Sequence, residues 1–201
     1  MHRVLFPTHI WKVNTRFVYL TFDDGPDPVA TPVVLDCLNA EAVKGTFFLS
    51  GTNVVKHPEI VREISTRGHA IGLHLFTHSR RPSFSRRRSF EEIINTTEAI
   101  AATGVTPARM IRPPYGFFTW NTVFAARELD YRIVMWTSLS GDFHQSWSEN
   151  RIVSNSLSRL GQGAILVFHD NPLTRSRIGK VLREVILRIK ERGFAFDSLR
   201  V

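Results

Sequence analysis

The sequence is poor in cysteine and has no long apolar run. Cysteine occurs once among the 201 residues, at position 37, which excludes an internal disulfide framework and a zinc site built from several thiolates. No apolar run approaches the roughly 20 residues that span a bilayer, and the first residues lack the apolar stretch and cleavage site of a signal peptide. We therefore expect a cytoplasmic protein, or a periplasmic or cell-envelope protein if a signal peptide has been removed.

Internal repeats, low-complexity tracts and long linkers are also missing from the sequence. Hydrophobic residues make up 43% of the chain and charged residues 22%, which indicates a globular protein and not a disordered one. We expect a single domain over residues 1–201. The 26 basic residues outnumber the 18 acidic residues and give a net charge of +8, which favours acidic partners such as phosphates, anionic glycans or nucleic acid.

Strand-like and helix-like segments alternate along the chain. Strands are expected at 17–22, 46–49, 70–73, 110–112, 132–136, 164–168 and 194–198, and helices near 31–40, 58–68, 89–104, 120–129, 152–160 and 178–191. The third helix is expected to begin at Ser89, because Ser89-Phe90-Glu91-Glu92 has the S-x-x-E form of a capping box. This alternation predicts an α/β fold with a parallel sheet, either a closed barrel or an open sheet.

Polar residues that can take part in catalysis or metal binding follow the ends of the expected strands. They are Asp23 and Asp24, His74 and His78, Arg112 and Tyr115, Asp142, and His169. Because the carboxyl ends of parallel strands meet at one face, where α/β enzymes build their sites, we expect these residues to form one active site.

Two histidines and an acidic pair suggest a metal site. The H-x-x-x-H spacing of His74 and His78 allows both imidazoles to reach one ion. Either Asp23 or Asp24 supplies a carboxylate, and two histidines with one carboxylate leave positions open for water and substrate. The alternative for the two histidines is that one is a capping residue and the other a surface residue. The alternative for the acidic pair is an Asx-type turn at Asp-Asp-Gly-Pro. We expect one divalent ion, Zn²⁺, with Co²⁺, Ni²⁺ or Mn²⁺ as alternatives.

Five ordered motifs resemble the polysaccharide deacetylases of carbohydrate esterase family 4, the NodB-homology domain. The motifs are Thr21-Phe22-Asp23-Asp24-Gly25-Pro26, the pair at 74 and 78, Arg112-Pro113-Pro114-Tyr115-Gly116, Asp142, and the strand that ends at His169. They span about residues 16–198. The resemblance implies a distorted barrel of about seven parallel strands, with the active site at their C-terminal ends. It also implies a metal-dependent hydrolase that removes N-acetyl groups from an amino-sugar glycan, such as peptidoglycan or chitooligosaccharide, and releases acetate.

The resemblance assigns a role to each of these residues. Asp24, His74 and His78 would bind the metal, and Asp23 would be the catalytic base. His169 would be the catalytic acid. Arg112 would orient the base, Asp142 would orient the acid, and the backbone N–H of Tyr115 would contribute to an oxyanion hole.

Three positions depart from the family pattern. Leu75 replaces the Ser or Thr that follows the first histidine, Leu139 replaces the first acid of the fourth motif, and Phe143 replaces its tryptophan. These departures make a catalytically eroded carbohydrate-binding homologue one alternative. A second alternative keeps the same metal site in a deformylase or other amide hydrolase that acts on a lipid-linked or anionic sugar.

Five arginines follow His78 within ten residues. Arg80, Arg81, Arg86, Arg87 and Arg88 are interpreted as a loop at the rim of the site, where Arg86, Arg87 and Arg88 would steer an anionic substrate. The alternative is an exposed loop without a role in binding. No nucleic-acid motif accompanies these arginines, so the expected partner is an N-acetylated carbohydrate and not nucleic acid.

Overall fold

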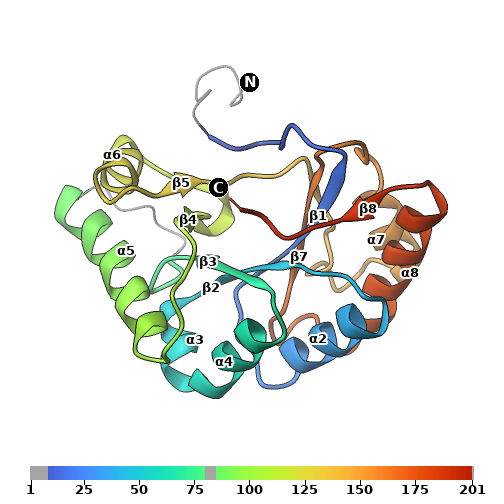
Figure 1. Ribbon diagram of the computed structural model, residues 1–201, viewed down its shortest axis with the longest axis horizontal. Coiled ribbons are helices and arrows are strands. Elements are labelled where there is room, and N and C mark those ends of the chain that lie inside the picture. Colours follow the sequence, from blue (N-terminus) through green and yellow to red (C-terminus); the bar gives the residue numbers. More distant parts are fainter. Residues whose placement is uncertain (1–8, 80–84, 201) are drawn as a thin grey trace.

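A curved parallel sheet forms the centre of the molecule, and helices surround it on three sides (Figure 1). The computed structural model describes residues 9–79 and 85–200. The strand order is β5-β4-β3-β2-β1-β7-β6, with β8 added beside β1, and every strand pairing is parallel. The strands are β1 (Phe17–Asp23), β2 (Thr46–Leu49), β3 (Ala70–Leu73), β4 (Met110–Ile111), β5 (Arg132–Ile133), β6 (Ser138–Leu139), β7 (Ile165–His169) and β8 (Ala195–Phe196).

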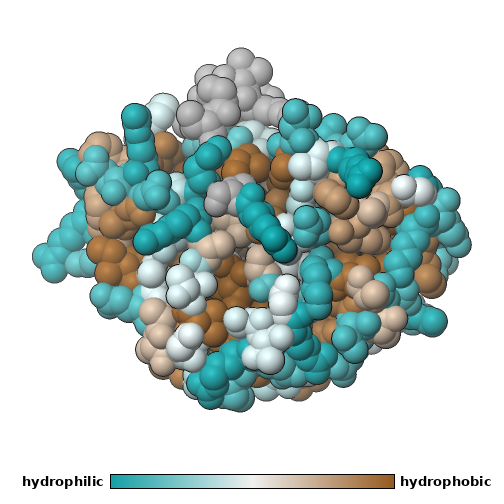
Figure 2. Space-filling view, in the orientation of Figure 1, coloured by the Kyte–Doolittle hydropathy of each residue, from teal (hydrophilic) through white to brown (hydrophobic). Residues whose placement is uncertain are grey.

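The helices follow the strands in alternation. They are α2 (Ala30–Ala40), α3 (Gly51–Lys56), α4 (Pro58–Thr66), α5 (Arg86–Ala101), the 3₁₀ turn η1 (Pro114–Gly116), α6 (Trp120–Glu128), α7 (Glu149–Ser156) and α8 (Ile178–Glu191). Within the two described ranges, no helix is long and apolar enough to cross a membrane. Hydrophilic residues cover much of the face in Figure 2, with apolar patches between them.

The barrel is open on one side. Its outer strands β5 and β6 do not pair with each other in the part of the chain that the structure describes. The N-terminal segment crosses this side (Figure 1): Ile10 bridges Val134, and the N–H of Val13 donates to the carbonyl of Gly163. The distorted seven-strand parallel barrel predicted from the sequence is confirmed.

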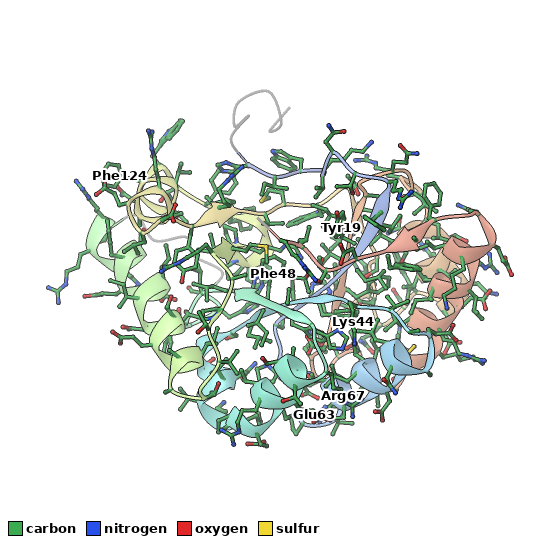
Figure 3. The ribbon with its side chains drawn as sticks, viewed as in Figure 1. Tyr19, Lys44, Phe48, Glu63, Arg67 and Phe124 are labelled. Carbon is green, nitrogen blue, oxygen red and sulfur yellow. The ribbon has the colours of Figure 1, made fainter. Side chains whose placement is uncertain are left out.

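Side chains alternate between the two faces of each strand. Phe47 packs in the large core between sheet and helices, and its neighbour Phe48 packs in a second cluster inside the barrel, together with Tyr19 (Figure 3). A strand has a period of two, so the inward positions of β1 are Tyr19, Thr21 and Asp23. The same period carries the inward rows of β1, β3, β4 and β7 up to a polar residue at the carboxyl end of each strand.

Local boundaries differ from the expected ones at several elements: β5 ends at Ile133 and not at residue 136, and α7 spans Glu149–Ser156 and not 152–160. Helix α5 begins at Arg86, three residues earlier than expected, because the hydroxyl of Ser85 accepts from the N–H of Arg88 and caps the helix. The prediction of a capping box at Ser89 is therefore wrong, and the Glu92 carboxylate binds elsewhere. The short elements α3 and β6 were not expected, because six and two residues are too few for a periodic pattern.

Candidate active site

Asp23 and Arg112 form a buried ion pair at the end of β1. Nη1 of Arg112 donates to Oδ1 of Asp23 and to the hydroxyl of Thr21, both at 2.7 Å. The remaining guanidinium nitrogens donate to the carbonyls of Val134 and Met135. Arg112 is 0% exposed. A buried charge needs partners for its donors, and this set holds both Arg112 and the Asp23 carboxylate in fixed orientations.

Asp24 turns away from Asp23 toward the two histidines. Its backbone has φ of 80°, which breaks the alternation of the strand at this residue. Oδ1 of Asp24 lies 3.3 Å from Nε2 of His74 and 2.7 Å from Nε2 of His78. Burial raises the pKa of Asp24, but the interactions of its carboxylate with His74 and His78 outweigh burial and lower it well below its usual range.

These three side chains suit a divalent metal ion. Their ligand atoms lie within 4.8 Å of one another. Nδ1 of His74 donates to the carbonyl of Arg112 at 2.7 Å; because a carbonyl can only accept, Nε2 presents its lone pair to the site. Two imidazoles and one carboxylate are a donor set that Zn²⁺ accepts, with positions left for water and substrate. The residues present therefore fit the ion that the sequence predicts.

His169 and Asp142 form a second pair across the pocket. Oδ1 of Asp142 accepts from Nδ1 of His169 and Oδ2 accepts from its backbone N–H, both at 2.7 Å. Burial lowers the pKa of His169, but the carboxylate of Asp142 and the charges of Asp24 and Asp23 outweigh it and raise the pKa to about 9. This shift favours the protonated ring at neutral pH, in which Nε2 is the remaining donor.

Tyr115 occupies a strained turn beside His74 and His78. Its φ is 57° and that of Gly116 is 69°, so two consecutive residues adopt the left-handed conformation that favours glycine. A side chain at position 116 would meet the ring of Trp136. The Tyr115 ring packs 5.0 Å from that of His78, which places the backbone of this turn at the pocket.

One cavity of about 570 Å³ joins all these groups. Its lining includes Asp23, Asp24, His74, His78, Tyr115 and His169, and its walls are mostly apolar, from Phe117, Trp136, Leu139, Phe143 and Leu173. The structure thus brings together the carboxylates, the histidines and the oxyanion-hole residue that the sequence predicts; Arg112 and Asp142 are fully buried behind them. A second cavity of about 730 Å³ runs beside β6 and is lined by three of the same residues, Trp136, Leu139 and Phe143.

Two of the three departures from the family pattern line this pocket. Phe143 packs edge-on against His169, with ring centroids 5.2 Å apart, and Leu139 lies in the wall. The hydrogen bonds between Asp142 and His169 form without an acid at position 139. The loss of that acid therefore leaves the His169 pair intact.

The prediction that Arg86, Arg87 and Arg88 belong to a loop at the rim of the site is wrong in part. Arg86, Arg87 and Arg88 form the first turn of α5 and not a loop, and among the described residues none of the three lines the pocket. Arg86 lies over the ring of Phe124, and Arg87 pairs with Glu91. Arg80 and Arg81 lie outside the described residues.

Sequence reasoning missed Asn171. Its side-chain amide donates to Oδ2 of Asp24 at 2.7 Å, so it fixes the carboxylate oxygen that faces away from the histidines. The sequence feature that could have indicated Asn171 is its position two residues after His169, at the carboxyl end of a strand. The amide of Asn53 also donates to the carbonyl of Asp24, and nothing in the sequence pattern connects Asn53 with Asp24.

The chain matches known proteins over most of its length. The family model described as polysaccharide deacetylase matches residues 12–134, a range that includes Asp23, His74 and Arg112 and ends before Asp142. A peptidoglycan-N-acetylglucosamine deacetylase of Bacillus cereus is 35% identical over 188 residues, covering 92% of this chain and 68% of the relative. A chitooligosaccharide deacetylase of Bradyrhizobium is 34% identical over 201 residues, covering 92% and 90%.

A solved structure extends the match to three dimensions. A crystal structure of a peptidoglycan N-acetylglucosamine deacetylase in complex with 4-naphthalen-1-yl-N-oxidanyl-benzamide superposes with a TM-score of 0.88 at 33% identity. It covers 96% of this chain and 91% of the other. The matched family model, the relatives and the shared fold together place this chain in the polysaccharide deacetylase family.

Proposed function

We propose that this protein is a metal-dependent N-deacetylase that hydrolyses the acetamido group of an amino-sugar glycan and releases acetate. The observation that carries the proposal is one pocket with three components. It has a metal-binding set of Asp24, His74 and His78, an Asp23 carboxylate held by Arg112, and a His169 imidazole whose Nδ1 is hydrogen-bonded to Asp142.

The metal-binding set would hold one divalent ion, with Zn²⁺ as the expected one. When bound, the ion would polarise the acetyl carbonyl and lower the pKa of a bound water from about 15.7 toward 7.

Asp23 is the proposed general base. Arg112 engages Oδ1 of the carboxylate, so Oδ2 is the oxygen that takes the proton from the attacking water. Because Arg112 stays cationic, it holds the carboxylate in one orientation before and after proton transfer. General-base catalysis of this kind contributes about 10²- to 10⁴-fold to the rate.

His169 is the proposed general acid. Its Nδ1 is occupied by Asp142, so Nε2 carries the proton that the departing amine takes up when the C–N bond breaks. The amine leaves as the free amino group of the sugar, and the acyl group leaves as acetate. The backbone N–H of Tyr115 stabilises the oxyanion that forms on the carbonyl oxygen, as donors at such positions do.

Acetate release from defined substrates tests the proposal. The purified protein with Zn²⁺ would be assayed on N-acetylated chitooligosaccharides and peptidoglycan fragments, and on N-formylated sugars as a comparison. Asp23→Asn and His74→Ala should lose at least about 10²-fold in kcat/KM. Asp36→Asn and His57→Ala are matched controls, since the Asp36 side chain is exposed, the His57 side chain is partly exposed, and both have surface partners.

Three outcomes would count against the proposal. Sugar binding without acetate release would favour the eroded homologue, and faster release of formate than of acetate would favour the deformylase. Full activity of Asp23→Asn would remove the base from the mechanism.

A further inference from the structure

The segment between the two metal-binding histidines has no regular secondary structure. Leu75 and His78 both have positive φ, 61° and 48°, although neither is a glycine or an asparagine. Such residues keep this conformation only where the surrounding structure holds them. His74 is fixed by β3 and by the carbonyl of Arg112, so the path of residues 75–77 decides where His78 lies.

The side chain of Glu92 holds this segment from helix α5. Oε2 of Glu92 accepts from the backbone N–H groups of Phe76 and Thr77 at 2.8 and 2.9 Å, and Oε1 accepts from the hydroxyl of Thr77 at 2.7 Å. Glu92 is 9% exposed. Within the described ranges no ion pair of Glu92 is formed, so the acceptors of this buried carboxylate serve the segment.

The carbonyls of the same segment face helix α3. The N–H of Gly51 donates to the carbonyl of Leu75, and that of Thr52 donates to the carbonyl of Phe76, both at 3.0 Å. The segment therefore lies between α3, which supplies donors to its carbonyls, and α5, which supplies acceptors to its N–H groups. On the α3 side these donors are backbone N–H groups, joined by the hydroxyl of Ser50, which donates to the carbonyl of Phe76 at 3.4 Å. On the α5 side the acceptors of both backbone N–H groups belong to one side chain, that of Glu92.

This arrangement bears on the departure at position 75. A Ser or Thr hydroxyl is expected there, and the Leu75 side chain cannot form a hydrogen bond. We propose that Glu92 is a positioning residue of the metal centre: through three hydrogen bonds it holds the 75–77 segment so that His78 reaches the ion that His74 and Asp24 also bind. The inference rests on the metal-binding function proposed above.

Metal affinity, measured apart from activity, tests this role. Titration of the metal-free protein with Co²⁺, followed by visible absorption, gives both the affinity and the coordination of the ion. Glu92→Met keeps the length of the side chain but loses both acceptors, and it should weaken Co²⁺ binding about 10- to 100-fold, as the loss of such supporting contacts does. Glu91→Met is the matched control, because Glu91 is exposed and pairs only with Arg87 among the described residues.

Two further variants separate positioning from a general loss of folding. Glu92→Gln should restore most of the affinity, because its Oε1 can accept both N–H groups and its Nε2 can donate to Thr77. Thr77→Val removes only the hydroxyl contact on an exposed residue and should weaken binding by less than Glu92→Met. If Glu92→Met does not fold, Thr77→Val still decides, because an unchanged Co²⁺ affinity in that variant overturns the proposal.

A double-mutant cycle identifies the path of the effect. If Glu92 acts through His78, Glu92→Met should cost little further affinity in a His78→Ala background. An equal loss in both backgrounds would overturn the proposal and indicate a general structural role. Failure of the wild-type protein to bind Co²⁺ would instead overturn the metal-dependent function and the role of Glu92 with it.

Discussion

Asp142 receives two hydrogen bonds from one residue, His169: the backbone N–H donates to Oδ2 and Nδ1 donates to Oδ1, each at 2.7 Å. Burial lowers the pKa of His169, and the Asp142 carboxylate is the largest of the effects that raise it to about 9. The pair therefore fixes both the orientation of the ring and its charge.

Asp142→Asn should move the alkaline limb of the pH profile. A general acid must be protonated, so activity is expected to fall as the pH rises through the pKa of His169. Without the carboxylate charge, burial lowers that pKa, and the alkaline limb of kcat moves to lower pH. At neutral pH kcat should fall by about 10²- to 10⁴-fold. Asp36→Asn is the control, and an alkaline limb at the wild-type pH in Asp142→Asn would mean that another group sets it.

The pair of Arg112 and Asp23 should contribute to folding as well as to catalysis. Arg112→Met leaves Asp23 buried without its cation, and loss of one partner of a buried pair costs about 3–5 kcal/mol. Arg67 pairs at the surface with Asp36 and with Glu63, the second of which is labelled beside it in Figure 3. Arg67→Met should cost about 0–1 kcal/mol. Denaturant unfolding measures both free energies. A loss in Arg112→Met no larger than in Arg67→Met would contradict this assignment.

Most of the site was predictable because it follows from strand periodicity. Asp23, His74, Arg112 and His169 each continue the inward row of a parallel strand at its carboxyl end, so a strand assignment is enough to place them on one face. Asp24 and Tyr115 were placed by their motifs, although positive φ at both takes them out of the regular pattern.

The contacts that support the site were not predictable in the same way. Glu92 matched a capping box by sequence, but the helix begins earlier, at Arg86, and turns the carboxylate toward a segment that precedes it by 15 residues. Asn53 reaches Asp24 from helix α3, whose six residues give no periodic signal. Such contacts depend on how elements pack in three dimensions, and local sequence does not encode them.

The first turn of α5 should not affect substrate binding. The side chain of Arg87 is 89% exposed and pairs with Glu91 on its own helix. Arg87→Ser should therefore leave KM unchanged for both neutral chitooligosaccharides and anionic peptidoglycan fragments. Kinetic assays at low and high salt check this expectation, because a steering role would raise KM for the anionic substrate at low salt only.

Metal binding should also stabilise the folded protein. A ligand that binds only the folded state adds RT ln(1 + [L]/Kd), or about 2.7 kcal/mol at a hundredfold excess over Kd. Zn²⁺ should therefore raise the midpoint of thermal unfolding of the wild-type protein, and a chelator should reverse the rise.

His78→Ala should remove most of that stabilisation, because it deletes one of the three protein ligands and leaves His74 and Asp24 in place. His69→Ala is the matched control: His69 accepts from the N–H of Gly45 through Nδ1, and burial lowers its pKa to about 4. This variant should unfold at a lower temperature without metal but keep the full Zn²⁺-dependent rise, since His69 lies at the opposite end of β3 from His74. An equal Zn²⁺ response in wild type and His78→Ala would place the ion elsewhere.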